Sequence, residues 1–214
     1  MSLAFSHDQR QDQVLAAAAS VFAARGFHKA SVRDVAAAAG MSLAGLYHYF
    51  PSKADLLHRI TTRAFDSLLA RLDAAPDGPP RERLTGFVRS HLAFFLSRPN
   101  EMKVMVRDAE CLPEGLEAEV AEKKRRYYQR CHDMLRELDG ARGEDELRLA
   151  TLALFGMLNW TYAWYRPERD GGPERLTERM LGIFLDGFLG GPAWLPVPVS
   201  AARAPMSCDD DDEL

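Results

Sequence analysis

Cysteine is scarce in this chain of 214 residues, and its spacing is unlike that of a disulfide framework. Cys111, Cys131 and Cys208 are odd in number and include no C-x-x-C pair. A small disulfide-stabilised secreted domain is therefore excluded, and a reducing cytosol is the expected compartment. Met1-Ser2-Leu3 does not lead from a basic stretch into an apolar run, so no secretion signal is expected.

The short motifs of common enzymes are also absent. The sequence contains no G-x-G-x-x-G, G-x-x-x-x-G-K-[ST], H-E-x-x-H or G-x-S-x-G pattern. Its histidines lie far apart, and Cys131-His132 are adjacent rather than three or four residues apart, so no metal site is expected. These absences predict a protein that is not an enzyme and needs no cofactor.

A membrane-spanning run is missing as well. Residues 149–165 contain no Asp, Glu, Lys or Arg, but they are short for a span. Thr151, Asn159 and Thr161 within this segment would need hydrogen-bond partners in lipid. We therefore expect no membrane partner and interpret the segment as a buried helix at a subunit interface.

Alanine, leucine and arginine are abundant and β-branched residues few, which favours an all-α fold. The formal charge of −4 is unevenly distributed. Six Lys or Arg and four acidic residues leave residues 1–60 at +2, whereas Asp209–Glu213 alone contribute −5. A mildly basic N-terminal part on an acidic body is typical of a protein that contacts DNA with one end.

The most informative segment is SVRDVAAAAGMSLAGLYHYFPSK, residues 31–53, which reads as a helix-turn-helix. Ser31 can cap a short helix, and Gly40 stands where that helix must end because glycine tolerates the left-handed conformation. Ser42 can cap a second helix, and Pro51 closes it. Two short helices joined by a tight Gly-containing turn are the geometry that places one helix in a major groove.

Residues 14–57, VLAAAASVFAARGFHKASVRDVAAAAGMSLAGLYHYFPSKADLL, resemble the N-terminal domain of the tetracycline-repressor (TetR) family. The resemblance rests on the Gly26-Phe27 break, the Asp34-Val35-Ala36 core, Ala39-Gly40 and Leu46-Tyr47 followed by Phe50-Pro51-Ser52-Lys53. It implies an N-terminal three-helix DNA-binding domain, a C-terminal helical ligand-binding and dimerisation domain, and double-stranded operator DNA as a partner.

The resemblance also implies which residues contact DNA. The first turn of the recognition helix would face base edges with small, mostly apolar side chains, so Arg33 is the strongest candidate for reading guanine, and DNA shape must contribute to specificity. Tyr47, Tyr49 and Lys53 would bind phosphates. The complete set is Ser31, Arg33, Ser42, Leu43, Ala44, Gly45, Tyr47, Tyr49 and Lys53.

Apolar periodicity and Pro/Gly breaks predict the remaining organisation. The predicted units are a DNA-binding domain over residues 1–57 with a linker helix to about 75, an effector-binding and dimerisation domain over 80–191, and a disordered acidic tail over 192–214. The predicted helices cover 8–25, 81–96, 100–111, 116–138, 144–165 and 173–189, besides the helix-turn-helix and the linker helix. The last two carry apolar residues on more than one face, which favours a homodimer through an intersubunit four-helix bundle.

The body is rich in aromatic residues and methionine, which suit either a packed core or an adaptable pocket. GMLNWTYAWYRP, residues 156–167, resembles TetR-family members that regulate fatty-acid, steroid and aromatic-acid degradation, several of which respond to acyl-CoA thioesters. The candidate ligand-binding residues are Phe94, Phe95, Met102, Met105, Tyr128, Asn159, Trp160 and Trp164.

Three hypotheses follow. The first is a cytoplasmic one-component regulator, a repressor released from its operator by a small apolar or acyl-CoA-type effector. The second is an effector-independent DNA-binding protein whose core is filled by side chains. The third is a small helical enzyme, against which the missing motifs argue. A basic run over residues 124–130 fits either a nucleotide phosphate or a solvated helix face.

Overall fold

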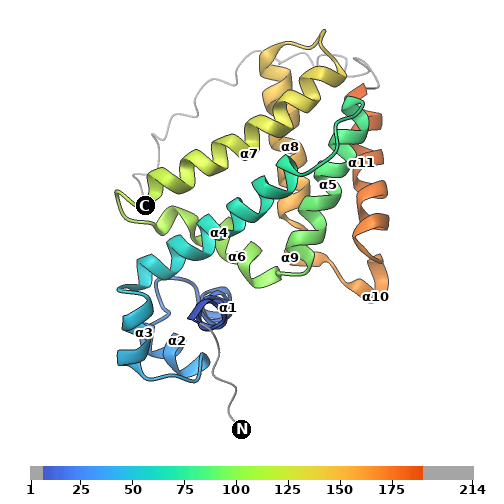
Figure 1. The fold of residues 1–214 in the computed structure, drawn as a ribbon. Coiled ribbons are helices and arrows are strands. Elements are labelled where there is room, and N and C mark those ends of the chain that lie inside the picture. Colours follow the sequence, from blue (N-terminus) through green and yellow to red (C-terminus); the bar gives the residue numbers. More distant parts are fainter. Residues whose placement is uncertain (1–6, 190–214) are drawn as a thin grey trace, which may run out of the picture.

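The computed structural model describes residues 7–189, and every regular element in this range is a helix, which confirms the predicted all-α fold. Figure 1 shows a small N-terminal group of helices joined by the long helix α4 to a larger bundle. We call the small group the head. It consists of α1 (His7–Arg25), α2 (Val32–Ala38), α3 (Leu43–Tyr49) and the first turns of α4 (Lys53–Asp73).

The larger bundle, which we call the body, packs around the second half of α4. Helix α4 contacts α7, and α11 lies along α5 (Figure 1). The body consists of α5 (Pro80–Leu96), α6 (Pro99–Asp108), the 3₁₀ turn η1 (Ala109–Cys111), α7 (Glu117–Leu138), α8 (Glu144–Asn159), α9 (Thr161–Trp164), α10 (Pro167–Asp170) and α11 (Pro173–Leu189). Among residues 7–189, no helix is both long enough and apolar enough to cross a membrane.

Serines begin three helices of the head: Ser31 and Ser42 cap the two short helices, as the sequence predicts, and Ser52 caps the long helix α4. The hydroxyls of Ser31, Ser42 and Ser52 each accept a hydrogen bond from the backbone N–H three residues on, at 3.2, 3.0 and 3.0 Å. Such a cap contributes about 1 kcal/mol by satisfying an amide that the helix leaves unpaired. Gly40, with φ of +64°, follows α2 in the left-handed region. Local signals therefore determine where these helices start and stop.

One continuous apolar core runs from the head into the body. In the head, Val14 and Phe22 of α1, Val35 of α2 and Leu46 of α3 are all fully buried. The core continues along the buried face of α4 to a second set of fully or almost fully buried side chains in the body: Leu84, Phe87, Val88, Leu92, Leu135, Leu147, Leu154 and Leu158.

The structure differs from the sequence prediction in the C-terminal half of the body. The single helix expected over residues 144–165 is broken at Trp160, which separates α8 from α9. Beyond the break, the hydroxyl of Thr161 donates to the carbonyl of Leu158 at 2.8 Å and so competes with the regular helix ladder. Helix α10, which begins with a proline, was not expected. The predicted acidic tail lies outside the described residues.

Candidate DNA-binding head and body cavity

Helix α2 is fixed at its N-terminus by a reciprocal cap. The carboxylate of Asp34 accepts from the backbone N–H of Ser31 at 2.9 Å while Ser31 caps the helix in return. Hydrogen bonds from Ser31, backbone first and then hydroxyl, lower the pKa of Asp34, and Arg25 acts in the same direction. Because Arg25 at the end of α1 lies 2.7 Å from Asp34, α1 is tied directly to the helix-turn-helix.

Helix α3, the expected recognition helix, exposes a small surface. Leu46 is fully buried and anchors it to the head, whereas Ser42, Ala44 and Tyr47 are exposed. A side chain at Gly45 would approach the capping oxygen of Ser42 to 3.1 Å, so glycine keeps this turn compact. The exposed groups offer few bidentate hydrogen-bond donors to base edges.

The other residues of the predicted DNA-contacting set are placed as follows. Arg33 is exposed on α2, Leu43 is half-buried, and Ser31 is exposed with its hydroxyl engaged in the cap. Tyr49 is half-buried, and its ring centroid lies 4.9 Å from that of His7. The structure thus gathers exposed side chains of α2 and α3, and their contact with DNA stays a prediction.

Lys53 has a structural use that the sequence did not reveal. Its ammonium donates to the backbone carbonyls of Phe27, His28 and Ala30, at 2.9, 3.3 and 3.1 Å. It also lies 4.4 Å from the centroid of the Phe27 ring, within cation–π range. All three ammonium hydrogens are therefore directed at the turn between α1 and α2, where no helix ladder satisfies these carbonyls. A phosphate contact for Lys53 stays a prediction.

Between the helices of the body lies a cavity of about 360 Å³. Its wall is mainly apolar, as in small-molecule sites, and the volume is near the lower end of their usual range. Five of the predicted ligand residues line it: Phe95, Met102, Met105, Tyr128 and Asn159. Residues from α4, α5, α6, α7 and α8 contribute to the same wall, and Lys124 of α7 is its one lysine or arginine.

Three predicted ligand residues lie elsewhere. Phe94 is buried but faces away from the cavity, with the guanidinium groups of Arg98 and Arg71 over its ring at 4.7 and 5.6 Å. Trp160 and Trp164 do not line the cavity either, and they are 59% and 41% exposed. The break in the helix at Trp160 changes the face on which these side chains emerge.

His91 and Tyr127 line the cavity and were not among the predicted residues. His91 is 2% exposed, and its Nδ1 lies 3.2 Å from the hydroxyl oxygen of Tyr127. Burial lowers the pKa of His91 to about 3, an effect that the side chain of Asn159 partly offsets. Burial also raises the pKa of Tyr127 well above its usual range. The sequence did carry a signal, since His91 falls on the apolar face of its helix, between Phe87 and Phe95.

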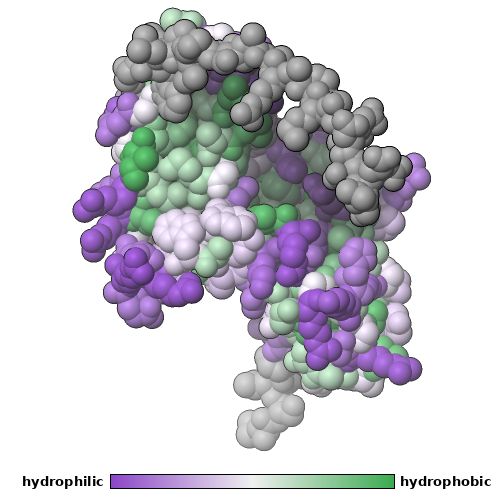
Figure 2. Space-filling view, turned by 180° about the vertical axis from the view of Figure 1, so that it is seen from behind, coloured by the Kyte–Doolittle hydropathy of each residue, from purple (hydrophilic) through white to green (hydrophobic). Residues whose placement is uncertain are grey.

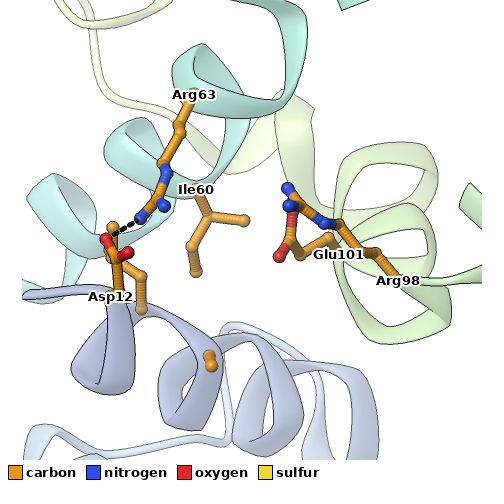
Figure 3. A pocket seen from close by; sticks show the side chains of 7 residues that line it. Asp12, Ile60, Arg63, Arg98 and Glu101 are labelled. Atoms are coloured by element: carbon orange, nitrogen blue, oxygen red, sulfur yellow. Dashed lines mark hydrogen bonds and ion pairs between the residues drawn. The ribbon is translucent and has the colours of Figure 1, made fainter. Parts of the chain in front are cut away.

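A second, smaller cavity of about 230 Å³ lies where α1, α4 and the start of α6 meet. Figure 3 shows Arg63 reaching towards Asp12 on one side of it, with Arg98 and Glu101 on the other. Arg63 pairs with Asp12 at 2.5 Å, and Arg98 lies 3.7 Å from Glu101. Both arginines already have acidic partners, so neither requires an anionic ligand. We therefore interpret this cavity as a loosely packed junction between head and body.

The head and its cavity-bearing body define a helix-turn-helix protein with an internal, mainly apolar cavity. Two family profiles match the chain: "Bacterial regulatory proteins, tetR family" over residues 14–60, and "Tetracyclin repressor-like, C-terminal domain" over residues 77–188. The chain belongs to the TetR family of DNA-binding transcriptional regulators and is not an enzyme.

Individual relatives agree with this assignment. The HTH-type transcriptional repressor KstR2 of Mycolicibacterium smegmatis is 29% identical over 190 residues, which cover 84% of this chain and 90% of the relative. The crystal structure of a TetR-family regulator from Bordetella parapertussis matches with a TM-score of 0.78 at 31% identity, over 87% of this chain and 98% of that one. AibR, solved with isovaleryl coenzyme A and operator DNA, matches with a TM-score of 0.70 at 24% identity, over 81% and 97% of the two chains, which shows the shared fold.

Proposed function

We propose that this regulator is a repressor whose dimer leaves its operator when a small apolar or acyl-CoA-type effector enters the body cavity. The observation that carries the proposal is the double role of α6. One face of this helix lines the cavity through Met102 and Met105, and the same helix packs against α1 of the head. A ligand that displaces α6 therefore acts directly on the head.

Arg107 is the strongest polar link along this route. Its guanidinium donates to the carbonyls of Phe22 and Ala23, the latter at 3.4 Å, near the end of α1 where the helix dipole favours a cation. The buried carboxylate of Asp108 holds Arg107 through two hydrogen bonds of 2.9 Å. Because Arg25 connects the end of α1 to Asp34, a shift of α6 has a continuous path to α2.

The loosely packed junction in Figure 3 gives α1 room to move against α4 and α6. The ligand need only favour a head position in which the two heads of a dimer no longer match successive major grooves. A coupling free energy of about 1–3 kcal/mol per site is typical of such switches. Repression is supported by the name of the Mycolicibacterium relative, which is a transcriptional repressor.

The size of the body cavity bears on the class of effector. At about 360 Å³ it suits an acyl chain or a compact apolar ring system, so the nucleotide part of a coenzyme A thioester would lie outside it. Lys124 on the wall is exposed and has no ion pair among residues 7–189, so it is available to a phosphate. By contrast, Arg125 and Arg130 are paired with Glu122 and Asp73. AibR offers a precedent, since its structure contains isovaleryl coenzyme A.

Dimerisation is proposed to occur through α8 and α11. Ile183 of α11 is 71% exposed, and Leu149 and Leu152 of α8 are 57% and 47% exposed. Figure 2 shows a broad apolar area on the side of the body where these helices lie. An apolar area of this kind is typical of a protein–protein interface. A two-fold axis through it pairs two heads, as recognition of a pseudo-palindromic operator requires.

The test is release of DNA. An operator is first selected from a random DNA pool with the ligand-free protein, and its affinity is then measured by fluorescence anisotropy with isovaleryl-CoA, octanoyl-CoA, octanoate, benzoate and CoA alone. We expect at least one acyl-CoA or apolar acid to weaken DNA binding about tenfold or more, and CoA alone to have no effect.

Met105→Trp provides the matched control, since the larger side chain fills the cavity. This variant should bind DNA like the wild type and resist release. If no compound releases the wild-type protein and Met105→Trp is indistinguishable from it, the regulator is effector-independent, which was the alternative raised by the sequence.

A further inference from the structure

His91 is a polar group in the otherwise aromatic part of the cavity wall. Its ring lies 4.7 Å from Phe95, 6.1 Å from Phe155 and 6.5 Å from Phe87, measured between centroids. His91 is 2% exposed, and its Nε2 has no hydrogen-bond partner among residues 7–189. An unpaired buried nitrogen destabilises the fold, so its presence beside a cavity requires an explanation.

The hydroxyl of Tyr127 determines which nitrogen of His91 carries the hydrogen. Tyr127 is 3% exposed, and His91 Nδ1 is the hydrogen-bond partner of its hydroxyl within the described chain. A buried phenol needs an acceptor for its hydrogen, and Nδ1 accepts only when it is unprotonated. Since the buried ring is neutral, its single hydrogen then resides on Nε2. The cavity wall therefore presents an N–H donor that no acceptor meets at hydrogen-bond geometry within residues 7–189, and the side chain of Asn159, which raises the pKa of His91 from the same wall, is the protein group that an effector oxygen would replace.

We infer that His91 Nε2–H is the anchor that receives a neutral carbonyl oxygen of the effector, from a ketone, an ester or a thioester. The inference rests on the proposed function, because it names the chemistry of a ligand in the same cavity. The apolar remainder of the ligand would lie against Phe95, Met102 and Phe155, which line the same wall.

A free carboxylate fits this end of the cavity poorly. A neutral imidazole supplies no charge to offset its desolvation, and a buried unpaired carboxylate is strongly disfavoured. Among residues 7–189, Lys124 is the only lysine or arginine that lines the cavity, and it is exposed. Free acids would therefore orient towards Lys124, whereas neutral carbonyl compounds would use His91.

The test uses three probes with the same nine-carbon skeleton: 2-nonanone, 1-nonene and nonanoate. Dissociation constants are measured by displacement of a fluorescent apolar dye from the full chain. We expect His91→Leu to weaken binding of 2-nonanone about tenfold, which is the value of one buried hydrogen bond, and to leave 1-nonene within about twofold. His91→Gln, which restores an N–H at a similar position, should recover most of the loss for 2-nonanone.

His132→Leu is the matched control, because His132 is also a buried histidine with an unpaired nitrogen but does not line the cavity. It should change neither affinity. A second measurement is independent of any ligand: ¹⁵N spectra of histidine-labelled protein should show His91 as the neutral Nε2–H tautomer at pH 6, and Tyr127→Phe should alter its tautomer ratio. Addition of 2-nonanone should shift Nε2 more than Nδ1.

Three results would each overturn the assignment of His91 as the anchor. They are equal losses of affinity for 2-nonanone and 1-nonene in His91→Leu, an Nδ1–H tautomer of His91, and no binding of 2-nonanone to the wild type. Failure of the anchor is distinguishable from failure of the proposed function. If acyl-CoA releases DNA from His91→Leu as it does from the wild type, the anchor is wrong and the regulator still has an effector. If 2-nonanone binds through His91 and no cavity ligand releases DNA, the anchor stands and the effector-driven repression fails.

Discussion

The head and the body treat their polar groups in opposite ways. In the head, the caps of Ser31, Ser42 and Ser52 and the ammonium of Lys53 satisfy backbone groups that the helices leave unpaired. In the body, buried nitrogens without a hydrogen-bond partner in the described chain belong to His91 and His132. The head is thus preorganised as a rigid reader of DNA, whereas the body retains unsatisfied groups and a cavity, which are the features that let a second molecule change its energy.

The largest effect is expected from placing the same charge in each region. Ile183→Glu puts a carboxylate in the proposed dimer interface and should cost about 3 kcal/mol or more of dimer stability, because the charge must be desolvated. Analytical ultracentrifugation should then show monomers at concentrations where the wild type is dimeric. Ala44→Glu, on exposed α3, should leave the dimer intact and abolish DNA binding by charge repulsion. A dimeric Ile183→Glu protein would show that α11 is not the interface.

The next largest effect is expected from removing the Lys53 ammonium, which holds the turn between α1 and α2 in the head. Lys53→Met keeps the apolar stem over Phe27 but removes the donor to three carbonyls, so the free energy of unfolding should fall by about 2 kcal/mol. Urea denaturation measures this change. Lys29→Met, at an exposed lysine without an ion pair among the described residues, is the control. Unchanged stability together with a smaller salt dependence of DNA binding would instead assign Lys53 to phosphate, as the family resemblance implies.

The buried histidine of the body should make stability fall with acid already at pH values where the carboxylate of Asp34 in the head, whose pKa is lowered, stays ionised. Folded His91 takes up a proton only near pH 3, whereas the unfolded side chain does so near its ordinary value of 6.5. Between these values the unfolded state binds more protons, so the stability contributed by His91 is present above pH 6.5 and declines as the pH falls. The expected loss is about 2 kcal/mol at pH 5 relative to pH 8. His91→Gln should remove this part of the pH dependence in urea titrations, and parallel curves for the two proteins would contradict it.

The difference between local caps in the head and long-range contacts elsewhere explains which features the sequence could predict. Helix starts in the head depend on side chains three residues apart, so Ser31, Ser42, Ser52 and Gly40 were recognisable from local pattern alone. The use of Lys53 was not, because it depends on where the turn between α1 and α2 places its carbonyls.

In the body, residue type did not reveal which face a side chain occupies. Phe94 and Phe95 are neighbours in one helix, about 100° apart, and only Phe95 lines the cavity. Trp160 and Trp164 were expected in the pocket from their residue type and the resemblance of residues 156–167, whereas the helix predicted over 144–165 breaks at Trp160 and both side chains lie outside the cavity. The proposal that His91 is an anchor depends on Tyr127, which comes from another helix and occupies its other nitrogen.

The smallest expected effect concerns the connection between the two regions. The double variant Arg107→Met with Asp108→Asn removes the hydrogen bonds to the end of α1 without leaving a buried carboxylate unpaired. Ligand affinity and DNA affinity should each stay within about threefold of the wild type, because neither site is touched. The coupling between them should fall by about 1 kcal/mol, a five- to tenfold change, as for other residues along coupling routes. Anisotropy titrations of operator DNA at saturating and zero ligand measure this coupling, with Lys103→Met on the same helix as the control. If the coupling survives in the double variant, the cavity reaches the head through the apolar contacts of α6 and α1, and the head would then be less independent of body packing than its local capping implies.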